Sequence, residues 1–304
     1  MGYLFRMGNK AASGRAWVWP WRSSFDDDAL RKARQDVAHL LPAVVITGGS
    51  KGIGQALAQR FLEAGHKTAI VARSAVRLEE AASELKAATG FEVATIICDV
   101  SEPNAFDVIT AALDRAGLYL DVLVNCAGTG LAGPFVDHSQ ADISRLLTLN
   151  VETVTRLTRA ALPLMLARRQ GGVMNVASLA ATVPGPNQAA YYASKAFVVS
   201  LTEAISSEMS GRGVRVAALL PGPVDTAFHA AMGADRSLYR FTLPSSSPAQ
   251  VARSGYRGFM FGNRVIVPGI SNMFFYVALR VLPHIVTVPL LYWLLRRPDD
   301  LSGP

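Results

Sequence analysis

The order of apolar and polar residues is regular between residues 43 and 267. Short apolar runs rich in β-branched residues predict strands at 43–47, 68–72, 93–98, 122–125, 173–177, 214–220 and 264–267. Apolar residues at helical spacing predict helices at about 53–64, 75–88, 104–117, 139–169, 189–210 and 248–258. Strands that are apolar throughout are typical of parallel sheets, because crossover helices cover both faces. The pattern therefore predicts an α/β fold, a doubly wound parallel sheet of the Rossmann type, in a single domain at residues 41–268.

Both ends of the chain lie outside this alternation. Residues 1–40 are expected to form an N-terminal arm followed by a short helix at 26–40, where acidic residues open a helical pattern. Residues 1–25 carry four basic residues, no acid and three tryptophans. They fit a flexible arm, a membrane-interface segment or an organelle-targeting piece, and the first is favoured.

Residues 269–304 form a hydrophobic C-terminal extension. Its two apolar runs, 273–279 and 285–295, are interrupted by Arg280, Pro283, His284 and Pro289. A membrane-spanning helix needs about 20 apolar residues with few charges, so a span is not favoured. A membrane-docking hairpin, a lip for a lipid-like substrate and an oligomer interface remain as interpretations. We favour peripheral contact of residues 270–297 with a membrane surface.

The net charge is +7, but no run of Lys and Arg exceeds two residues. This argues against a nucleic-acid partner and suits an anionic cofactor or an anionic membrane. The two cysteines, Cys98 and Cys126, end predicted interior strands and are expected to be buried, reduced thiols. The five histidines show no metal-ligand spacing, so no metal site is expected. Without an apolar signal core at the N-terminus, we expect a cytoplasmic protein, with membrane association as an alternative.

A glycine-rich turn joins the first predicted strand to the first helix of the repeat. It reads Thr47-Gly48-Gly49-Ser50-Lys51-Gly52-Ile53-Gly54. Glycine allows a tight turn and close approach of phosphate, and the helix N-terminus attracts negative charge. An ordinary glycine-rich loop is the alternative, but the position between strand and helix favours a dinucleotide site. The expected cofactor contacts here are Thr47, Gly48, Ser50, Lys51, Gly52, Ile53 and Gly54.

The end of the second strand indicates which cofactor is bound. An NAD site places an acidic residue about twenty positions beyond the glycines. Arg73 stands there instead, and the first acid that follows it is Glu79. An arginine can pair with a 2′-phosphate, and Lys51 adds a second positive charge. The sequence therefore favours NADP(H) over NAD(H), unless both residues are ordinary solvated charges.

Tyr191 and Lys195 are four residues apart on a predicted helix and share one face, while Ser178 ends the fifth strand. The T-G-x-x-x-G-I-G turn, the Y-x-x-x-K spacing and the upstream serine resemble the classical short-chain dehydrogenase/reductase family over residues 43–268. Tyr192 does not fit, because Ala196 follows it at the fourth position. The resemblance implies that Tyr191 donates a proton, Ser178 orients a carbonyl and Lys195 holds the nicotinamide ribose. A lysine cation and the cofactor's own ring charge are expected to lower the tyrosine pKa from about 10.

The same resemblance extends the site. It implies that Asn150, in the middle of the predicted helix 139–169, relays protons to Lys195 through water, and an amide there also suggests a local kink. It implies an adenine contact at Asp99. The turn Asn125-Cys126-Ala127-Gly128 resembles the family's N-N-A-G, with Cys126 in place of the second asparagine. The remaining expected cofactor residues are Val100, Asn125, Ala127, Gly128, Pro221, Gly222, Val224 and Thr226.

Residues 227–247 interrupt the alternation and are rich in apolar and aromatic side chains. They fit either a lid over a hydrophobic substrate or a cover for the core. We expect NADPH-dependent reduction of a hydrophobic ketone or aldehyde to an alcohol, by a homo-oligomer, dimer or tetramer. An NADP(H)-binding regulator without turnover, and an alcohol oxidant, are the alternatives.

Overall fold

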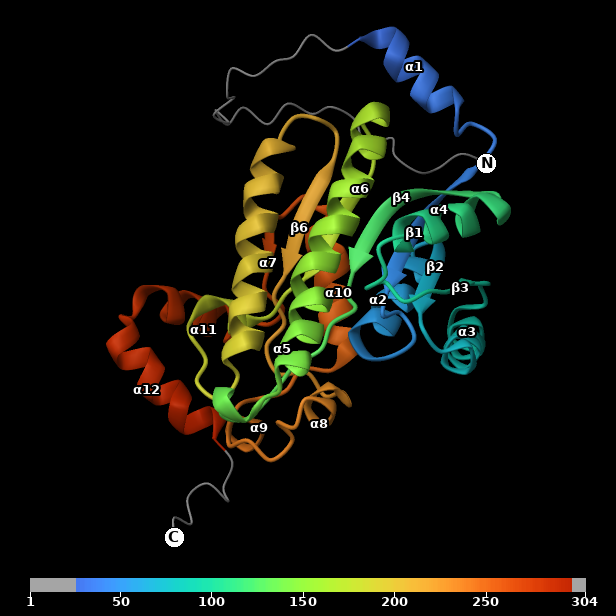
Figure 1. Ribbon diagram of the computed structural model, residues 1–304. Helices are drawn as coiled ribbons and strands as arrows, with labels where there is room; N and C mark the ends of the chain where they lie inside the picture. The colour runs from blue at the N-terminus through green and yellow to red at the C-terminus, as the bar shows by residue number, and fades with distance from the viewer. Residues whose placement is uncertain (1–25, 297–304) are drawn as a thin grey trace.

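The computed structural model describes residues 26–296, so the interpretations of residues 1–25 lie outside the described residues. Seven parallel strands form one sheet in the order β3-β2-β1-β4-β5-β6-β7 (Figure 1). The strands are β1 (Leu41–Thr47), β2 (Lys67–Ala72), β3 (Ala94–Ile97), β4 (Leu118–Asn125), β5 (Gly172–Val176), β6 (Arg215–Leu219) and β7 (Val265–Ile266). This order confirms the predicted doubly wound sheet of the Rossmann type.

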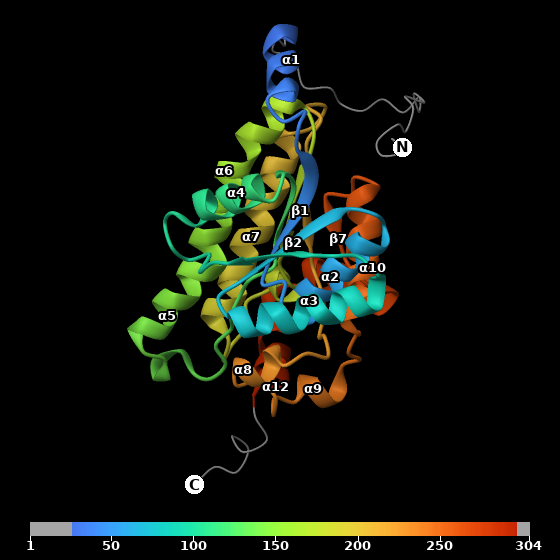
Figure 2. The same cartoon turned by 90° about the vertical axis from the view of Figure 1, so that its right-hand side faces the viewer.

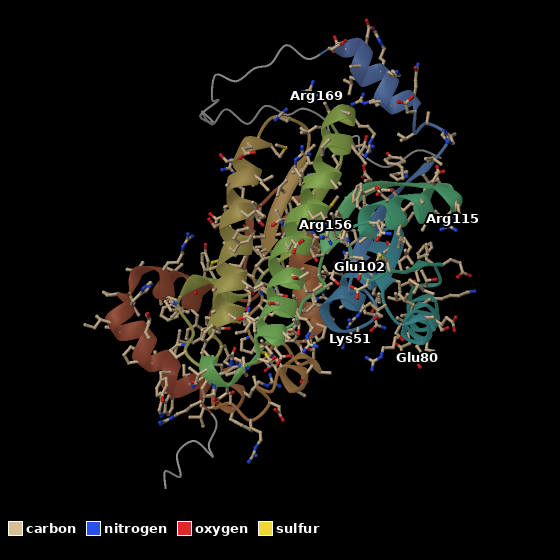
Figure 3. All side chains as sticks on the ribbon, in the orientation of Figure 1. Lys51, Glu80, Glu102, Arg115, Arg156 and Arg169 are labelled. Carbon is tan, nitrogen blue, oxygen red and sulfur yellow. The ribbon has the colours of Figure 1, made fainter. Side chains whose placement is uncertain are left out.

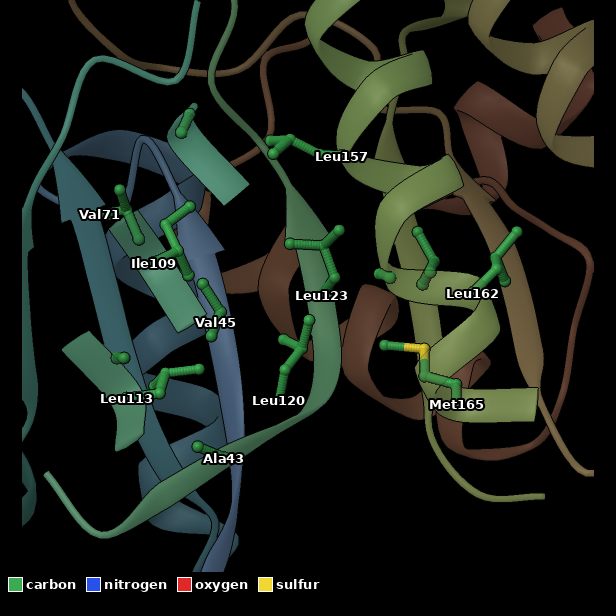
Figure 4. Packing of buried hydrophobic residues seen from close by; sticks show 14 of the residues in the cluster. Ala43, Val45, Val71, Ile109, Leu113, Leu120, Leu123, Leu157, Leu162 and Met165 are labelled. Atoms are coloured by element: carbon green, nitrogen blue, oxygen red, sulfur yellow. The ribbon is translucent and has the colours of Figure 1, made fainter. Parts of the chain in front are cut away.

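Helices cover both faces of the sheet, as Figure 2 shows edge-on. One face carries α2 (Gly52–Glu63), α3 (Ala75–Thr89) and α10 (Pro248–Met260), and the other carries α4 (Ala105–Arg115), α6 (Thr153–Arg168) and α7 (Ala189–Glu208). Successive side chains of a strand point to opposite faces. Val45 therefore packs with Leu123 and Met165 in one cluster (Figure 4), while Val44 and Ile46 pack with the helices of the other face.

The strand order reverses at β1, which has β2 on one side and β4 on the other. The carboxyl ends of β1 and β4, at Thr47 and Asn125, therefore diverge into loops that leave toward opposite faces. In open parallel sheets a ligand binds in the crevice at this point. The fold alone thus locates the candidate site beyond the carboxyl ends of β1 and β4.

The predicted helix 139–169 is divided into three parts. A π-helical turn, Thr148–Glu152, separates α5 (Gln140–Leu147) from α6, in agreement with the kink expected at Asn150. The predicted helix 26–40 is shorter, since α1 spans only Asp27–Gln35. Asp26 caps its start by accepting hydrogen bonds from the backbone of Asp28 and Ala29.

Two segments outside the alternation lie together at the carboxyl end of the sheet (Figure 1). The first holds α8 (Phe228–Ala231) and α9 (Tyr239–Thr242), and the second holds α11 (Ile270–Val281) and α12 (His284–Leu295). Short 3₁₀ turns occur at Phe135–Asp137 and Leu179–Thr182. Within residues 26–296, no helix combines the length and apolar character that crossing a membrane requires.

Candidate active site

The glycine-rich turn between β1 and α2 is too tight for residues that carry a Cβ atom at its glycine positions. Gly48 and Gly52 have φ of +66° and +57°, and a Cβ on Gly54 would lie 2.3 Å from the carbonyl oxygen of Gly48. Lys51 precedes α2 without any side-chain cap, so the first N–H groups of the helix remain available to a ligand. Figure 3 shows Lys51 at this end of the sheet. The turn therefore fits the pyrophosphate of a dinucleotide.

Thr47 and Asn125 lie behind the wall of this cleft rather than on it. The buried Thr47 hydroxyl accepts hydrogen bonds from the backbone N–H groups of Cys126 and Ala127, at 3.0 and 3.1 Å. The Asn125 amide donates to Thr158 and Asn175 inside the core. Both were expected as cofactor contacts. Because their polar groups are used within the protein, they position the two turns instead.

Positively charged side chains border the cleft at the carboxyl end of β2. Arg73 extends into solvent and lies 3.7 Å from the carboxylate of Asp99. Partial burial acts to raise the pKa of Asp99, but hydrogen bonds from Ser101 and the Arg73 charge outweigh it and lower that pKa. Arg77, in the first turn of α3, lines the same cleft with Lys51. Arg77 was not expected here from the sequence, although it stands four residues after Arg73, one helical turn away.

Ser178, Tyr191 and Lys195 meet in this cleft, as the motif predicts. Tyr191 and Lys195 are 8% and 7% exposed on α7, and the Lys195 Nζ donates to the carbonyl of Val176 at 3.0 Å. The Ser178 hydroxyl accepts from the N–H of Ala180 at 3.1 Å and also hydrogen-bonds the Tyr191 phenol. Their polar groups therefore converge at the carboxyl end of β5.

Burial dominates the electrostatics of the pair. Burial raises the pKa of Tyr191 to about 12, and the hydrogen bond from Ser178 only partly opposes this. Burial also lowers the pKa of Lys195 to about 8. The lysine Nζ lies 5.9 Å from the centroid of the tyrosine ring. Desolvation is therefore the dominant influence on the pKa of Tyr191, which is a protonated phenol at neutral pH.

Asn150 holds the loop after β4 rather than facing the cleft. It is 1% exposed, and its amide donates to the Thr129 carbonyl at 2.8 Å and to Ser194 at 3.1 Å. Its Oδ1 accepts from the Thr129 N–H at 3.0 Å. A Cβ on Gly128 would lie 3.3 Å from this oxygen and 3.6 Å from the Lys195 Nζ. These contacts make Asn150 a positioning residue for the turn beside Lys195.

The loop after β6 closes the cleft opposite the glycine-rich turn. Pro221, Gly222, Val224 and Thr226 line the cleft. A Cβ on Gly222 would lie 2.3 Å from Oδ1 of Asn272, a buried residue of α11. Gly222 therefore lets α11 pack closely on this loop. Asn272 was not anticipated from the sequence, because only the packing of two distant segments gives it this role.

The cleft has a volume of about 1610 Å³. Its lining also includes Ser50, Ile53, Val100 and Ala127. A site for one drug-sized ligand usually measures about 300–1,000 Å³, so this cleft can hold a dinucleotide and a second molecule. The end beyond Tyr191 is mostly apolar, and its walls include Phe228 and Met232. Helices α11 and α12 contribute Phe275, Leu279, Leu290, Leu291, Leu294 and Leu295.

Cys126, in place of the asparagine expected in the turn, is a partly buried free thiol beside this site, and Cys98 is a buried one. Burial raises the pKa of the Cys126 thiol to about 12, so it is neutral at physiological pH. Among residues 26–296, no group of three or more His, Cys, Asp or Glu side chains is arranged to hold a metal ion.

Two curated relatives resemble the central part of the chain. A short chain dehydrogenase of Pseudocercospora fijiensis is 39% identical over 184 residues, which are 60% of this chain and 59% of the relative. A very-long-chain 3-oxoacyl-CoA reductase of Bos taurus is 35% identical over 186 residues, with the same two coverages. The matched part thus spans about three fifths of the length of these relatives.

Solved structures share more of the fold. A short-chain dehydrogenase from Sphingobium yanoikuyae in complex with NADPH is 31% identical, with a TM-score of 0.70 over 79% of this chain and 92% of that chain. A short chain dehydrogenase/reductase from Burkholderia phymatum in complex with NAD is 26% identical, with a TM-score of 0.72 over 80% and 93%. The family model described as short chain dehydrogenase matches residues 42–237. Because this match covers more than half of the chain, the protein belongs to the short-chain dehydrogenase family of oxidoreductase enzymes.

Proposed function

We propose that the protein reduces a hydrophobic ketone or aldehyde to an alcohol with NADPH, and that Tyr191 is the proton donor. One observation carries this proposal: Ser178, Tyr191 and Lys195 line the same cleft as the glycine-rich turn. A bound nicotinamide cofactor would supply the hydride. The residues that would hold it are Gly48, Ser50, Lys51, Gly52, Ile53, Gly54, Arg73, Asp99, Val100, Ala127, Gly128, Pro221, Gly222, Val224 and Thr226.

The side chains divide the proton chemistry among them. The Ser178 hydroxyl hydrogen-bonds the substrate's carbonyl oxygen and sets its orientation. The Tyr191 phenol, protonated at neutral pH because burial raises its pKa, gives its proton to that oxygen as negative charge develops there. Lys195, anchored on the Val176 carbonyl, compensates the charge left on the phenolate and holds the ribose. In the reverse reaction the same residue, as the phenolate, would accept the proton of the alcohol.

The preference for NADPH rests on charge at the end of β2. Arg73, Arg77 and Lys51 border the cleft, and the sequence Ala72-Arg73-Ser74 has no acid to bind a ribose hydroxyl pair. The Asp99 carboxylate pairs with the Arg73 guanidinium and limits its orientations. These residues suit a 2′-phosphate, which needs paired donors and positive charge.

The apolar wall beyond Tyr191 supports a hydrophobic substrate. Several relatives are named very-long-chain 3-oxoacyl-CoA reductase, which agrees with an apolar ketone. The test is consumption of NADPH with a panel of ketones and aldehydes by the full-length protein. A regulator without turnover would bind NADPH and consume none, and the convergence of all three catalytic side chains argues against that alternative.

We also propose that the outer face of α11 and α12 contacts an anionic membrane surface, as a peripheral contact of a cytoplasmic protein. Ile270, Phe274, Val281, Ile285 and Trp293 are exposed there. Residues 270–296 contain no acidic residue but include Arg280 and Arg296. An apolar surface with only positive charge complements anionic lipid headgroups.

The expected dimer or tetramer can use a different surface. Leu147, Leu164 and Phe197 are exposed apolar residues of α5, α6 and α7. Light scattering after size-exclusion chromatography measures this assembly directly.

A further inference from the structure

Arg156 of α6 lies beside the loop that joins β3 to α4, and Figure 3 shows it near Glu102 of that loop. Its Nη2 lies 3.0, 2.9 and 2.9 Å from the carbonyl oxygens of Val100, Ser101 and Glu102. Its Nη1 pairs at 3.3 Å with the carboxylate of Glu152, one helical turn earlier. Three successive carbonyls of the loop therefore share one guanidinium, which Glu152 orients.

The same stretch of the loop borders the cleft. Asp99, Val100 and Ser101 all line the cleft. The Asp99 Oδ1 accepts hydrogen bonds from the N–H and the hydroxyl of Ser101 at 2.9 and 2.6 Å, so the conformation of the loop fixes the carboxylate. The Asp99 Oδ2 lies 3.7 Å from the guanidinium of Arg73. The orientation of Asp99, and through it that of Arg73, therefore depends on the backbone that Arg156 holds.

Arg156 is not among the described residues that line the cleft, so its effect on a ligand must pass through the loop. Its guanidinium suits this role, because hydrogen bonds from a charged donor are shorter and stronger than neutral ones. A lysine would keep the charge, but its single nitrogen cannot reach Glu152 and the three carbonyls from two separate positions. The planar fork of an arginine is therefore what connects the helix to the loop.

The start of α6 also holds a second loop of the cleft. Asn150, in the π-helical turn, exchanges hydrogen bonds with the backbone of Thr129 in the loop after β4. Arg156 lies six residues later and binds the loop after β3. The short stretch 150–156 thus fixes two of the loops that border the cleft.

We propose that Arg156 is a positioning residue for the adenosine half of the cofactor. By holding the carbonyls of residues 100–102, it keeps Asp99 and Val100 facing the adenine and keeps Asp99 paired with Arg73. Loss of the guanidinium lets the loop move, so affinity falls for every ligand that contains the adenosine half and stays unchanged for the nicotinamide half. This inference rests on the proposed binding of NADPH.

Two fragments of NADPH test this division. Adenosine 2′,5′-bisphosphate contains the adenine, its ribose and the 2′-phosphate, and reduced nicotinamide mononucleotide contains the other half. Isothermal titration calorimetry measures the affinity of the full-length protein for NADPH and for both fragments. Arg156→Met should weaken the binding of NADPH and of the bisphosphate about tenfold, because the charge-assisted hydrogen bonds to the loop are lost. Its affinity for the mononucleotide should stay within about twofold of the wild type, because distant sites act independently.

Arg159→Met is the matched control, because Arg159 is an exposed arginine of the same helix. It should bind all three ligands like the wild type. Hydrogen exchange at the backbone amides of residues 99–104 should be faster in Arg156→Met than in the control, because the loop opens more often. Thermal unfolding checks that the variants fold. If Arg156→Met does not fold, Arg156→Lys takes its place, with a smaller loss expected for NADPH and the bisphosphate alone.

An equal loss of affinity for both fragments, or an unchanged affinity for the bisphosphate, overturns the inference. Binding of NADPH by the wild type then leaves the proposed function intact. If the wild type binds neither NADPH nor the bisphosphate, the proposed function and this inference both fail.

Discussion

The Lys195 Nζ donates a 3.0 Å hydrogen bond to the carbonyl oxygen of Val176, at the carboxyl end of β5. This bond holds a buried ammonium at the edge of the sheet, one helical turn from Tyr191. Burial lowers the pKa of Lys195 from 10.5 to about 8, a change that corresponds to about 3 kcal/mol. The buried charge of Lys195 therefore lowers the free energy of unfolding.

We predict that Lys195→Met stabilises the protein at pH 7 and removes its activity. The lysine pKa is lower in the folded than in the unfolded chain, so the unfolded chain binds more protons between pH 8 and 10.5, and wild-type stability rises with pH there. The advantage of the methionine variant should therefore be largest below pH 8 and shrink by pH 10. Urea unfolding of both proteins at pH 7 and pH 10 measures the difference in their free energies of unfolding. A difference that is equal at both pH values contradicts the prediction.

Tyr191→Phe should reduce turnover by at least about 100-fold, because general acids contribute about 10²–10⁴-fold. NADPH affinity should change little, since the substitution leaves the glycine-rich turn and Arg73 unchanged. Tyr192→Phe is the matched control, because it removes a hydroxyl from the next residue in the same cleft. NADPH oxidation and NADPH binding should be measured on both variants. Comparable turnover by Tyr191→Phe and wild type would refute the assigned acid.

The sheet could be predicted because its strands are buried on both faces. Val44, Val45 and Ile46 are at most 2% exposed, and such a strand must be apolar at every position. The catalytic residues could be predicted because their spacing is local to α7 and the end of β5. The only sequence signal for the π-helical turn was the polar Asn150 between apolar residues.

The remaining features depend on contacts between distant segments. Asn125 donates to Asn175, fifty residues away, and this buried bond withdraws it from the cleft. The Tyr191 pKa is predicted to fall because of a nearby lysine and the ring charge of a bound cofactor. Burial, which raises it, depends on α8, α9 and α12 covering the site and cannot be read from the spacing of two residues.

Arg73→Ala and Arg77→Ala should each weaken NADPH binding about tenfold or more, because each removes a cation from the 2′-phosphate. NADH affinity should change less than twofold, since NADH lacks this phosphate. Arg115→Ala is the control, because Arg115 lies on α4, away from Lys51 (Figure 3). Fluorescence titration of each variant with both cofactors provides the measurement. Equal losses for NADPH and NADH would show that these arginines do not recognise the phosphate.

The proposed membrane contact predicts a loss of vesicle binding when the outer face of the α11–α12 hairpin, the hairpin surface, becomes charged. Phe274 and Ile285 are 71% and 83% exposed on α11 and α12, so glutamates at both positions should leave the fold unchanged. Wild-type protein should sediment with phosphatidylcholine vesicles that contain phosphatidylglycerol, and less with phosphatidylcholine alone or at high salt. The double variant should lose at least about tenfold in binding, because it places two charges in the apolar contact.

Phe91→Glu provides the control, since Phe91 is also an exposed aromatic residue but precedes β3, far from the hairpin. It should bind vesicles like the wild type. The competing occupant of the hairpin surface is a second copy of the chain, and sedimentation velocity without lipid distinguishes the two. If the wild type is a dimer that the double variant dissociates, and neither binds anionic vesicles, the surface is a subunit interface and the membrane contact is refuted.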